Sequence, residues 1–156
     1  MIPSWVALRD RIGARSISRL ASVPVALGTG GVLGVARWLV PSAEGHGTHL
    51  QLGLRTCTVL AWTGTPCPMC GATTTFALMA DFRPIDALLN QPFAVILFLL
   101  CLATCAIATA EVVQPRDRWS RLFVGIEPYE GWAAGGFLVA MAAGWIWKIA
   151  HMAPIT

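Results

Sequence analysis

Charge is scarce in this chain. Only 12% of its 156 residues are charged, against about 25% in an average soluble protein, whereas 56% are hydrophobic and the mean hydropathy is +0.65. A soluble domain of this length cannot bury so much apolar surface, which indicates a membrane protein and makes the lipid bilayer its first partner. The net charge is only +3. Because nucleic-acid binding needs a broad basic face, we expect no nucleic-acid partner.

The chain has few cysteines, and their number is odd. The five are Cys57, Cys67, Cys70, Cys101 and Cys105, so they cannot all pair within the chain. Cys101 and Cys105 lie four residues apart in an apolar run, where cysteine usually acts as a small packing residue. The remaining three fall in a polar-leaning segment and are the candidates for chemistry.

Three apolar segments are long enough to cross a bilayer, over about residues 20–40, 92–113 and 131–150. For the first, the alternative is a cleaved signal peptide, although its basic leader is long and Pro41-Ser42-Ala43 is a poor cleavage site. The predicted fold is an all-α membrane protein with three transmembrane helices. Residues 20–156 form a single membrane domain in this prediction.

Residues 1–19 form a basic arm that holds four arginines and one acid, Asp10. Trp5, Leu8 and Ile12 recur between the arginines at helical spacing. The arm is therefore either an amphipathic helix on the cytoplasmic leaflet, where arginines meet anionic lipid, or a disordered basic tail.

Arginines are distributed unevenly along the chain. The arm and residues 114–130, a polar connection, hold seven of them: Arg9, Arg11, Arg15, Arg19, Arg116, Arg118 and Arg121. The longer segment 41–91 holds two, Arg55 and Arg83. By the positive-inside rule, we expect a multi-pass protein of the inner (cytoplasmic) membrane with a cytoplasmic N-terminus and segment 41–91 outside.

Segment 41–91 contains a Cys-Pro-x-Cys-Gly turn, Cys67 to Gly71. Glycines and prolines divide the segment, which predicts an interfacial or re-entrant loop with short helices over 72–80 and 85–89. In the turn, proline restricts one backbone angle and glycine permits a left-handed conformation. The motif or structural residues are Gly64, Pro66, Pro68, Gly71 and Thr73.

Three interpretations of the cysteines stay open. In the first they are structural, either as packed thiols or as a disulfide from Cys57 to Cys67 or Cys70 that would leave one thiol over. Outside the cytoplasm cysteines tend to pair. Alternatively, they bind a metal: Cys57, Cys67 and Cys70 with His49 or His46 would give a Cys3His set, which suits Zn2+. The third interpretation is a redox pair of Cys67 and Cys70 before a helix.

A row of small residues in the last apolar segment, Gly136, Ala140 and Gly144, recurs every four positions. Such a row lets another helix approach closely, in a second membrane protein or a second copy of the chain. Three spans and a short loop leave little room for an enclosed substrate pocket. We therefore expect a non-enzymatic membrane module with a structural cysteine knuckle and a packing face for a partner. The alternative is a metal-binding or thiol–disulfide site built on the loop cysteines with a histidine.

The loop also carries a family resemblance. Cys57, then Thr63-Gly64-x-Pro66-Cys67-Pro68-x-Cys70-Gly71-x-Thr73, then Ala87 and Gln91-Pro92, resemble the bacterial domain of unknown function 2752 (DUF2752) family over roughly residues 36–110. Members are small predicted membrane proteins with this motif in a loop. The chain differs at Thr74, where many members carry arginine, and at Gln91, where many carry asparagine. The resemblance implies a membrane location and the importance of Cys67, Cys70 and Gly71; it implies no activity.

Overall fold

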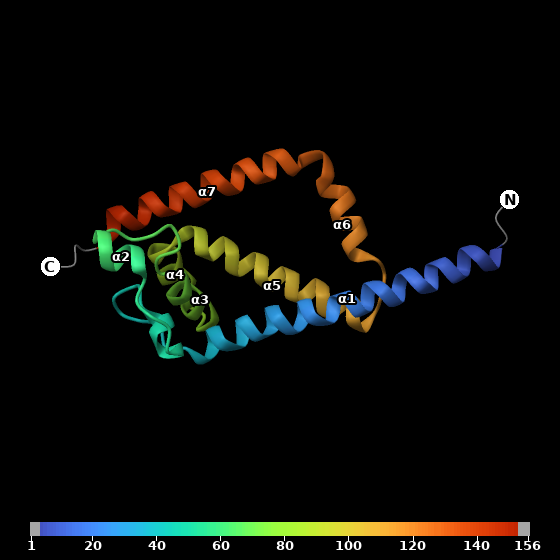
Figure 1. Ribbon diagram of the computed structural model, residues 1–156, viewed down its shortest axis with the longest axis horizontal. Coiled ribbons are helices and arrows are strands. Elements are labelled where there is room, and N and C mark those ends of the chain that lie inside the picture. The colour runs from blue at the N-terminus through green and yellow to red at the C-terminus, as the bar shows by residue number, and fades with distance from the viewer. Residues whose placement is uncertain (1–3, 153–156) are drawn as a thin grey trace.

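The structure, a computed structural model, describes the backbone of residues 4–152 and the side chains of residues 13 and 16–152. Within this range the chain forms helices and turns and no strand (Figure 1). The helices are α1 Ser4–Trp38, α2 Thr58–Thr63, α3 Ala72–Ala80, α4 Pro84–Asn90, α5 Pro92–Val113, α6 Arg118–Ile126 and α7 Glu130–His151, with 3-10 turns η1 Thr48–Leu52 and η2 Glu127–Tyr129.

Three helical stretches are long and apolar enough to cross a membrane, over Ser16–Trp38, Pro92–Val113 and Arg118–His151. The short helices α2, α3 and α4 lie in the cysteine-containing segment between the first two. The predicted all-α membrane fold, with three spans and a loop of short helices, is confirmed.

The basic arm and the first apolar segment form one helix. α1 continues from Ser4 to Trp38 with Pro24 inside it, so residue 20 marks no break in the helix. The side chains of Arg9, Arg11 and Arg15 lie outside the described ones. The amphipathic character of the arm therefore stays a prediction.

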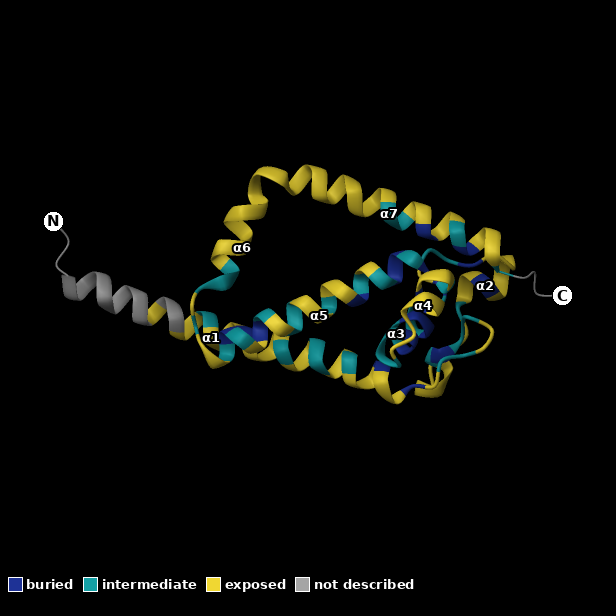
Figure 2. Ribbon diagram, turned by 180° about the vertical axis from the view of Figure 1, so that it is seen from behind, coloured by how far each residue is buried: buried dark blue, intermediate teal, exposed yellow. Residues whose placement is uncertain are grey.

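α1 and α5 lie side by side, and α7 meets α5 close to the cysteine loop (Figure 1). Figure 2 shows buried residues gathered at this loop end, whereas α6 and most of α7 are exposed. Ala77, Ala87, Phe93 and Ala94 are almost completely buried there. The rings of Phe93 and Phe137 meet edge to face at 5.0 Å, which joins α5 to α7. Closely packed apolar residues thus support the loop.

The other end of α5 closes around a buried carboxylate. Glu111 accepts hydrogen bonds from the backbone N–H groups of Arg116, Asp117 and Arg118, at 2.9, 2.8 and 3.3 Å. It also accepts the Ser18 hydroxyl at 2.9 Å and an Arg118 guanidinium N–H at 3.0 Å. Buried charges need such partners. The Glu111 carboxylate therefore ties the start of α6 to α1 and α5.

Residues 114–130 were predicted to form a polar loop. This prediction is wrong, because most of the segment is helical. α6 carries Trp119, Leu122, Phe123 and Ile126, which lie at the spacing of one helix face. The Trp119 indole N–H donates to the Ser22 hydroxyl at 2.9 Å. The apolar spacing was visible in the sequence, but the arginines around it favoured a solvated loop.

Candidate functional site: a thiol cavity

The chain reverses twice before α3. α2 follows Cys57 and ends at Gly64, which has a left-handed backbone with a φ of +67°. The Cys70 N–H then donates to the Cys67 carbonyl at 2.9 Å, which closes the Cys-Pro-x-Cys turn. Gly71, with a φ of +84°, directs the chain into α3. The two glycines thus occupy the left-handed positions that side chains disfavour.

Side-chain N–H groups from α7 and the α4–α5 junction hold this turn by its carbonyls. Each carbonyl accepts one bond from a side chain: Pro66 from the Trp145 indole at 2.8 Å, Pro68 from the Gln91 amide at 2.9 Å, and Gly71 from the Asn90 amide at 3.2 Å. Asn90 also donates to the Thr75 hydroxyl at 2.9 Å. None of these bonds involves sulfur, so the turn has supports other than its cysteines.

Lys148, the single lysine of the chain, is buried beneath the turn with 4% of its surface exposed. Its ammonium donates to the Asn90 side-chain oxygen at 2.7 Å and to the Gly45 carbonyl at 3.0 Å. A Cβ atom at Gly71 would lie 2.6 Å from that carbonyl and 3.0 Å from the ammonium. Gly71 is therefore required by space as well as by its backbone angle.

Sequence reasoning missed these partners. Lys148 and Trp145 lie near the end of an apolar helix, a position typical of interface anchors. Asn90 precedes Pro92, where asparagine is a common helix cap. In the structure Asn90 instead ends α4, and Gln91 precedes α5 without a side-chain cap. No local pattern indicated that these side chains meet at a turn some 20 to 80 residues away.

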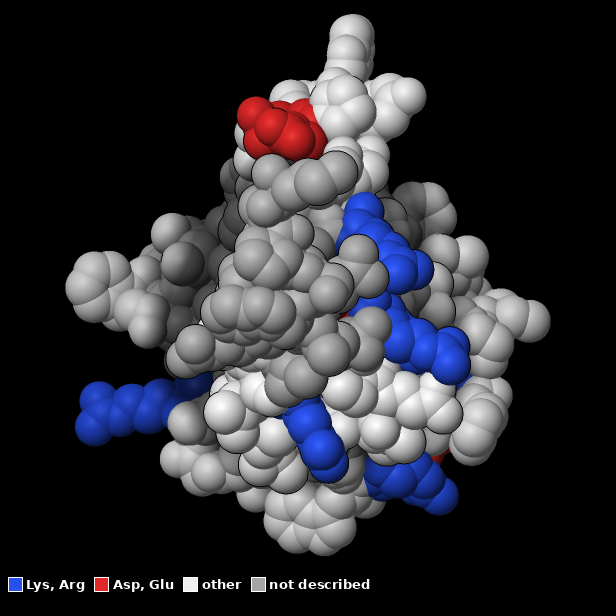
Figure 3. All heavy atoms as spheres, turned by 90° about the vertical axis from the view of Figure 1, so that its right-hand side faces the viewer, with Lys and Arg blue, Asp and Glu red and all other residues white. Residues whose placement is uncertain are grey.

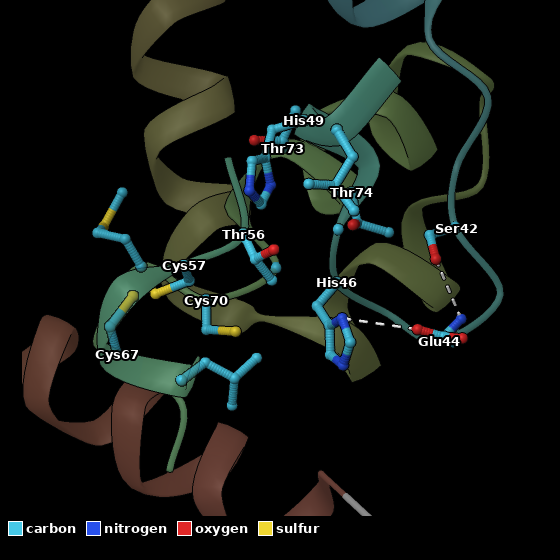
Figure 4. Close-up of a pocket in the computed structure, with 15 residues that line it drawn as sticks. Ser42, Glu44, His46, His49, Thr56, Cys57, Cys67, Cys70, Thr73 and Thr74 are labelled. Atoms are coloured by element: carbon cyan, nitrogen blue, oxygen red, sulfur yellow. Dashed lines mark hydrogen bonds and ion pairs between the residues drawn. The ribbon is translucent and has the colours of Figure 1, made fainter. Parts of the chain in front are cut away.

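All the cysteine and histidine candidates of the loop line one cavity of about 370 Å³. They are Cys57, Cys67, Cys70, His46 and His49, and Thr73 lies among them. Figure 4 shows the Cys57 and Cys67 side chains directed toward one another, with Cys70 on the side where His46 lies. The predicted cysteine and histidine residues thus lie around the same cavity.

The cavity wall is fixed by polar contacts. The hydroxyls of Thr48 and Thr74, both buried, are 2.8 Å apart and share a hydrogen bond. His49 Nε2 lies 3.2 Å from the Arg55 carbonyl oxygen, and His46 Nδ1 lies 3.8 Å from a Glu44 carboxylate oxygen. Both histidines are therefore oriented by loop residues.

Within the described residues, no group of three or more His, Cys, Asp or Glu side chains is arranged to hold a metal ion. Cys57, Cys67, Cys70 and His49 thus share a cavity without forming a coordination shell. The Zn2+ site stays a prediction that would require these side chains to move.

All five cysteines are unpaired in the structure, and the three cavity thiols are not equivalent. A hydrogen bond from the Leu60 backbone, helped by one with the Cys67 side chain, lowers the pKa of Cys57 below the usual thiol value. Burial raises the pKa of Cys67 and of Cys70. For Cys70, the Lys148 ammonium opposes part of this increase. Cys57 is therefore the thiol of the three that ionises most readily.

Cys101 and Cys105 lie elsewhere, along the contact of α5 with α1. The Cys101 thiol donates to the Thr29 carbonyl at 3.9 Å, and the Cys105 sulfur would lie 3.8 Å from a Cβ at Gly30. These contacts agree with the packing role predicted for them.

A family model described as "Protein of unknown function (DUF2752)" matches residues 57–105. Residues 57–105 are therefore similar to this family. The resemblance predicted from the sequence is confirmed over these residues. No curated protein and no solved structure matches the chain.

The DUF2752 segment contains all five cysteines and the two amides, of Asn90 and Gln91, that hold the turn. Trp145, Lys148 and the two cavity histidines lie outside it. The thiol cavity is therefore completed by residues beyond the matched segment.

The small residues Gly136, Ala140 and Gly144 on α7 differ in how far they are buried. A Cβ at Gly144 would lie 2.6 Å from the Phe93 Cβ atom, so Gly144 already packs against α5 of its own chain. Gly136 is exposed and has open space around it, and Ala140 is half-buried. A partner helix is thus left with the Gly136 end of the row.

Proposed function

We propose that the protein exchanges thiols and disulfides through Cys57 and Cys67 at the outer face of the inner membrane. The supporting observation is that the two thiols line one cavity with their side chains directed toward one another (Figure 4). Their pKa values are shifted in opposite directions. The pair differs from the Cys67/Cys70 pair predicted from the motif spacing. Since other side chains hold the loop, its sulfurs are available for chemistry.

The exchange starts at Cys57, whose lowered pKa favours the thiolate. The Cys57 thiolate attacks one sulfur of a partner disulfide, because the thiolate is the nucleophile. The partner disulfide breaks and its second sulfur leaves as a thiolate. Cys67 then gives up its proton and displaces the partner from Cys57, which leaves a Cys57–Cys67 disulfide and two partner thiols. One disulfide is lost and one is formed, so electrons and protons balance.

Charge supports the proposed orientation. Arg19, Arg116, Arg118 and Arg121 lie toward the end of the molecule opposite the loop. Figure 3 looks onto that end, where blue side chains gather. Near the loop, Arg37 pairs with Asp81 and Arg83 with Asp86, each at 2.8 Å. The larger number of arginines at the loop-distal end thus favours that end as cytoplasmic.

The test is a thiol count on purified, reduced protein equilibrated with glutathione redox buffers. The protein is unfolded with a chelator present, alkylated and weighed intact. We expect three adducts under oxidising buffers and five under reducing ones, with peptide mapping to Cys57 and Cys67. The matched control is the Cys101→Ser/Cys105→Ser variant, in which the same pair should form. Five adducts under all conditions, or a disulfide that excludes Cys57, would contradict the proposal.

A second candidate is a non-enzymatic module whose cysteine loop is structural and whose Gly136 face binds a helix. The open space at Gly136 favours it. Under this candidate, Cys57→Ser should reduce the amount of folded protein. Under the thiol proposal, Cys57→Ser should accumulate normally and lose exchange, because the turn carbonyls keep their N–H donors. A Zn2+ ion in the purified chain, with five adducts, would support the metal-binding alternative instead.

A further inference from the structure

A cavity of about 550 Å³ lies along the loop-distal half of α5, and Arg118 of α6 closes one end of it. We call it the α5–α6 groove. Its α5 side is a stripe on one helix face, formed by Leu102, Cys105, Ala106, Thr109, Ala110 and Val113. The polar side chains of Gln114 and Arg118 follow at the end of the stripe. The groove therefore has an apolar length and a cationic end.

The cationic end is held in place from behind. Arg118 Nη1 donates to the buried Glu111 carboxylate at 3.0 Å and to the Ala110 carbonyl at 2.9 Å, and it also contacts the Gln114 carbonyl. Within residues 16–152, the hydrogen bonds of this guanidinium all come from Nη1. The Nε and Nη2 groups thus keep N–H donors for a bound molecule.

Further arginines surround this end of the molecule. The exposed ones are Arg19, Arg116 and Arg121. Figure 3 shows the blue side chains gathered there. Glu111 balances the charge of Arg118, and Asp117 is outnumbered by the three exposed arginines. Arg121 follows Arg118 by three residues, which places the two on the same side of α6. An anion at the end of the groove is therefore attracted by more than one guanidinium.

The length of the helices places α6 at the membrane surface. The stretch Arg118–His151 has 34 residues and would be about 51 Å long as one helix, against a hydrocarbon core of about 30 Å. The 22 residues of α7 alone reach about 33 Å. α6 turns away from α7 at η2, which contains Pro128, and crosses the end of the bundle (Figure 1). The cationic end of the groove thus lies at the level of the lipid headgroups.

The dimensions of the groove select its occupant. Leu102 to Val113 covers about 17 Å of helix, close to the thickness of one leaflet, about 15 Å. A helix of that length, about 10 Å across, would need about 1,300 Å³, more than the volume of the groove. An acyl chain therefore fits where a helix of a second copy would not.

We propose that the α5–α6 groove binds an anionic phospholipid, with an acyl chain along the α5 stripe and the phosphate on Arg118 and Arg121. A phospholipid is apolar along its length and charged at one end, as the groove requires. Phosphate oxygens accept strong hydrogen bonds from guanidinium groups. A net negative headgroup also uses the surplus of arginines, which a zwitterionic headgroup would not. The inference is independent of the loop cysteines and of the thiol exchange proposed for them.

The experiment uses the full chain, purified in a neutral detergent and freed of lipid. Palmitoyl-oleoyl phosphatidylglycerol, or its zwitterionic phosphatidylcholine counterpart, is titrated in, and native mass spectrometry measures the fraction of protein that carries lipid. We expect phosphatidylglycerol to bind about fivefold or more tightly than phosphatidylcholine, which is the effect of a single arginine near an anionic headgroup. An excess of inorganic phosphate is added in a parallel titration.

Two matched pairs of variants locate the lipid. Ala106→Trp fills the stripe, whereas Ala103→Trp places the same ring on exposed α5 surface outside the groove. Ala106→Trp should weaken phosphatidylglycerol binding about tenfold, equivalent to about 1.4 kcal/mol, and Ala103→Trp should not.

The second pair tests the headgroup. Arg121→Gln removes an arginine at the groove, and Arg55→Gln removes an exposed arginine of the loop. Arg121→Gln should weaken phosphatidylglycerol binding about fivefold and leave phosphatidylcholine binding unchanged. Arg55→Gln should alter neither. Arg118 is left in place because it holds Glu111, and lipid-free melting temperatures show that each variant is folded.

Several outcomes would overturn the inference and leave the thiol proposal standing. Equal binding of the two lipids would remove the charge selection, and equal effects within either pair of variants would remove the site. Displacement of phosphatidylglycerol by inorganic phosphate would indicate a site for a free anion. A dimer that carries no lipid would mean that a second copy covers the groove.

Discussion

At the scale of single residues, the loop depends on a few close contacts rather than on its cysteines. Gly71 lies against the Gly45 carbonyl, the Lys148 ammonium and the Asn90 amide at once. The motif glycine and the only lysine of the chain are thus parts of one packed unit. Substitutions of Gly71 or Lys148 therefore test the stability of the loop without changing a cysteine.

Gly71→Ala should destabilise the protein more than Gly64→Ala. Both residues have positive φ, so both variants incur a backbone cost of about 1–3 kcal/mol. Only at Gly71 would the new Cβ atom meet other atoms, the nearest at 2.6 Å, whereas nothing lies within 4 Å at Gly64. Overpacking adds about 1–3 kcal/mol. Thermal unfolding in detergent measures the difference; equal melting temperatures would contradict the contact.

Cys57 should react with a thiol reagent at lower pH than Cys67 or Cys70. The reactive form is the thiolate, so a lowered pKa moves the onset of labelling to lower pH and a raised pKa moves it to higher pH. Labelling at a series of pH values, followed by peptide mass spectrometry, gives the order in which the three thiols become reactive.

A substitution tests the cause of the Cys57 shift. Cys67→Ala removes a hydrogen bond that lowers the pKa of Cys57, so labelling of Cys57 should move to higher pH. Cys101→Ala, in α5, is the control and should leave the Cys57 curve in place. A Cys57 curve indistinguishable from those of Cys67 and Cys70 in the wild-type protein would show that the thiols are equivalent.

At the scale of helices, the decisive contact is that of α7 with α5 near the loop. Trp145, Lys148 and Gly144 all lie on α7 and all reach the loop or the start of α5. Lys148 follows Gly144 by four residues and Trp145 by three, which places it on the same helix face as each of them. α7 therefore acts as a support for the cysteine turn rather than as a lipid-facing span alone.

Gly144→Ala and Gly136→Ala should have opposite effects on stability. At Gly144 the added Cβ would lie 2.6 Å from the Phe93 Cβ atom and 3.2 Å from its backbone nitrogen, neither of which can move freely. We expect a loss of about 1–3 kcal/mol. At Gly136 nothing lies within 4 Å, and alanine favours a helix over glycine by up to about 1 kcal/mol.

Denaturant or thermal unfolding of the two variants side by side checks this prediction. A more stable Gly144→Ala protein would mean that α7 does not pack on Phe93. If Gly136→Ala folds normally and loses a membrane partner in cross-linking, the second candidate function gains support.

At the scale of the whole molecule, the two ends of the bundle are chemically different. One end holds the Glu111 carboxylate, the arginines of α6 and the N-terminal part of α1. The other holds the thiol cavity. If the helices cross a membrane, the two ends of the bundle face different compartments.

The orientation is tested with reporter fusions at two positions. Ser42 follows α1 at the loop end, and Asp117 precedes α6 at the other end. We expect a reporter active only outside the cytoplasm to work at Ser42, and one active only inside to work at Asp117. The opposite pattern would place the thiols in a reducing compartment, where disulfides are rare.

Much of the fold was predictable because its signals are local. Apolar runs, prolines and glycines indicated the spans and α3 and α4, since a helix in lipid satisfies its own backbone. α6 was missed although its apolar spacing was present, because the arginines around Trp119 and Leu122 resembled a solvated loop. The cavity residues Cys57, Cys67, Cys70, His46 and His49 were all candidates from their side-chain chemistry alone.

By itself, the sequence determined that this is a helical membrane protein with its chemistry in one cysteine-containing loop, because composition and periodicity act over neighbouring residues. Only the tertiary structure decided which groups meet. It brought Cys57, Cys67 and Cys70 to one cavity with His46 and His49. It also showed that Lys148, expected at a membrane edge, is buried in contact with Asn90. These contacts depend on how α7, α5 and α1 converge, and side-chain packing between distant segments leaves no pattern along a single chain.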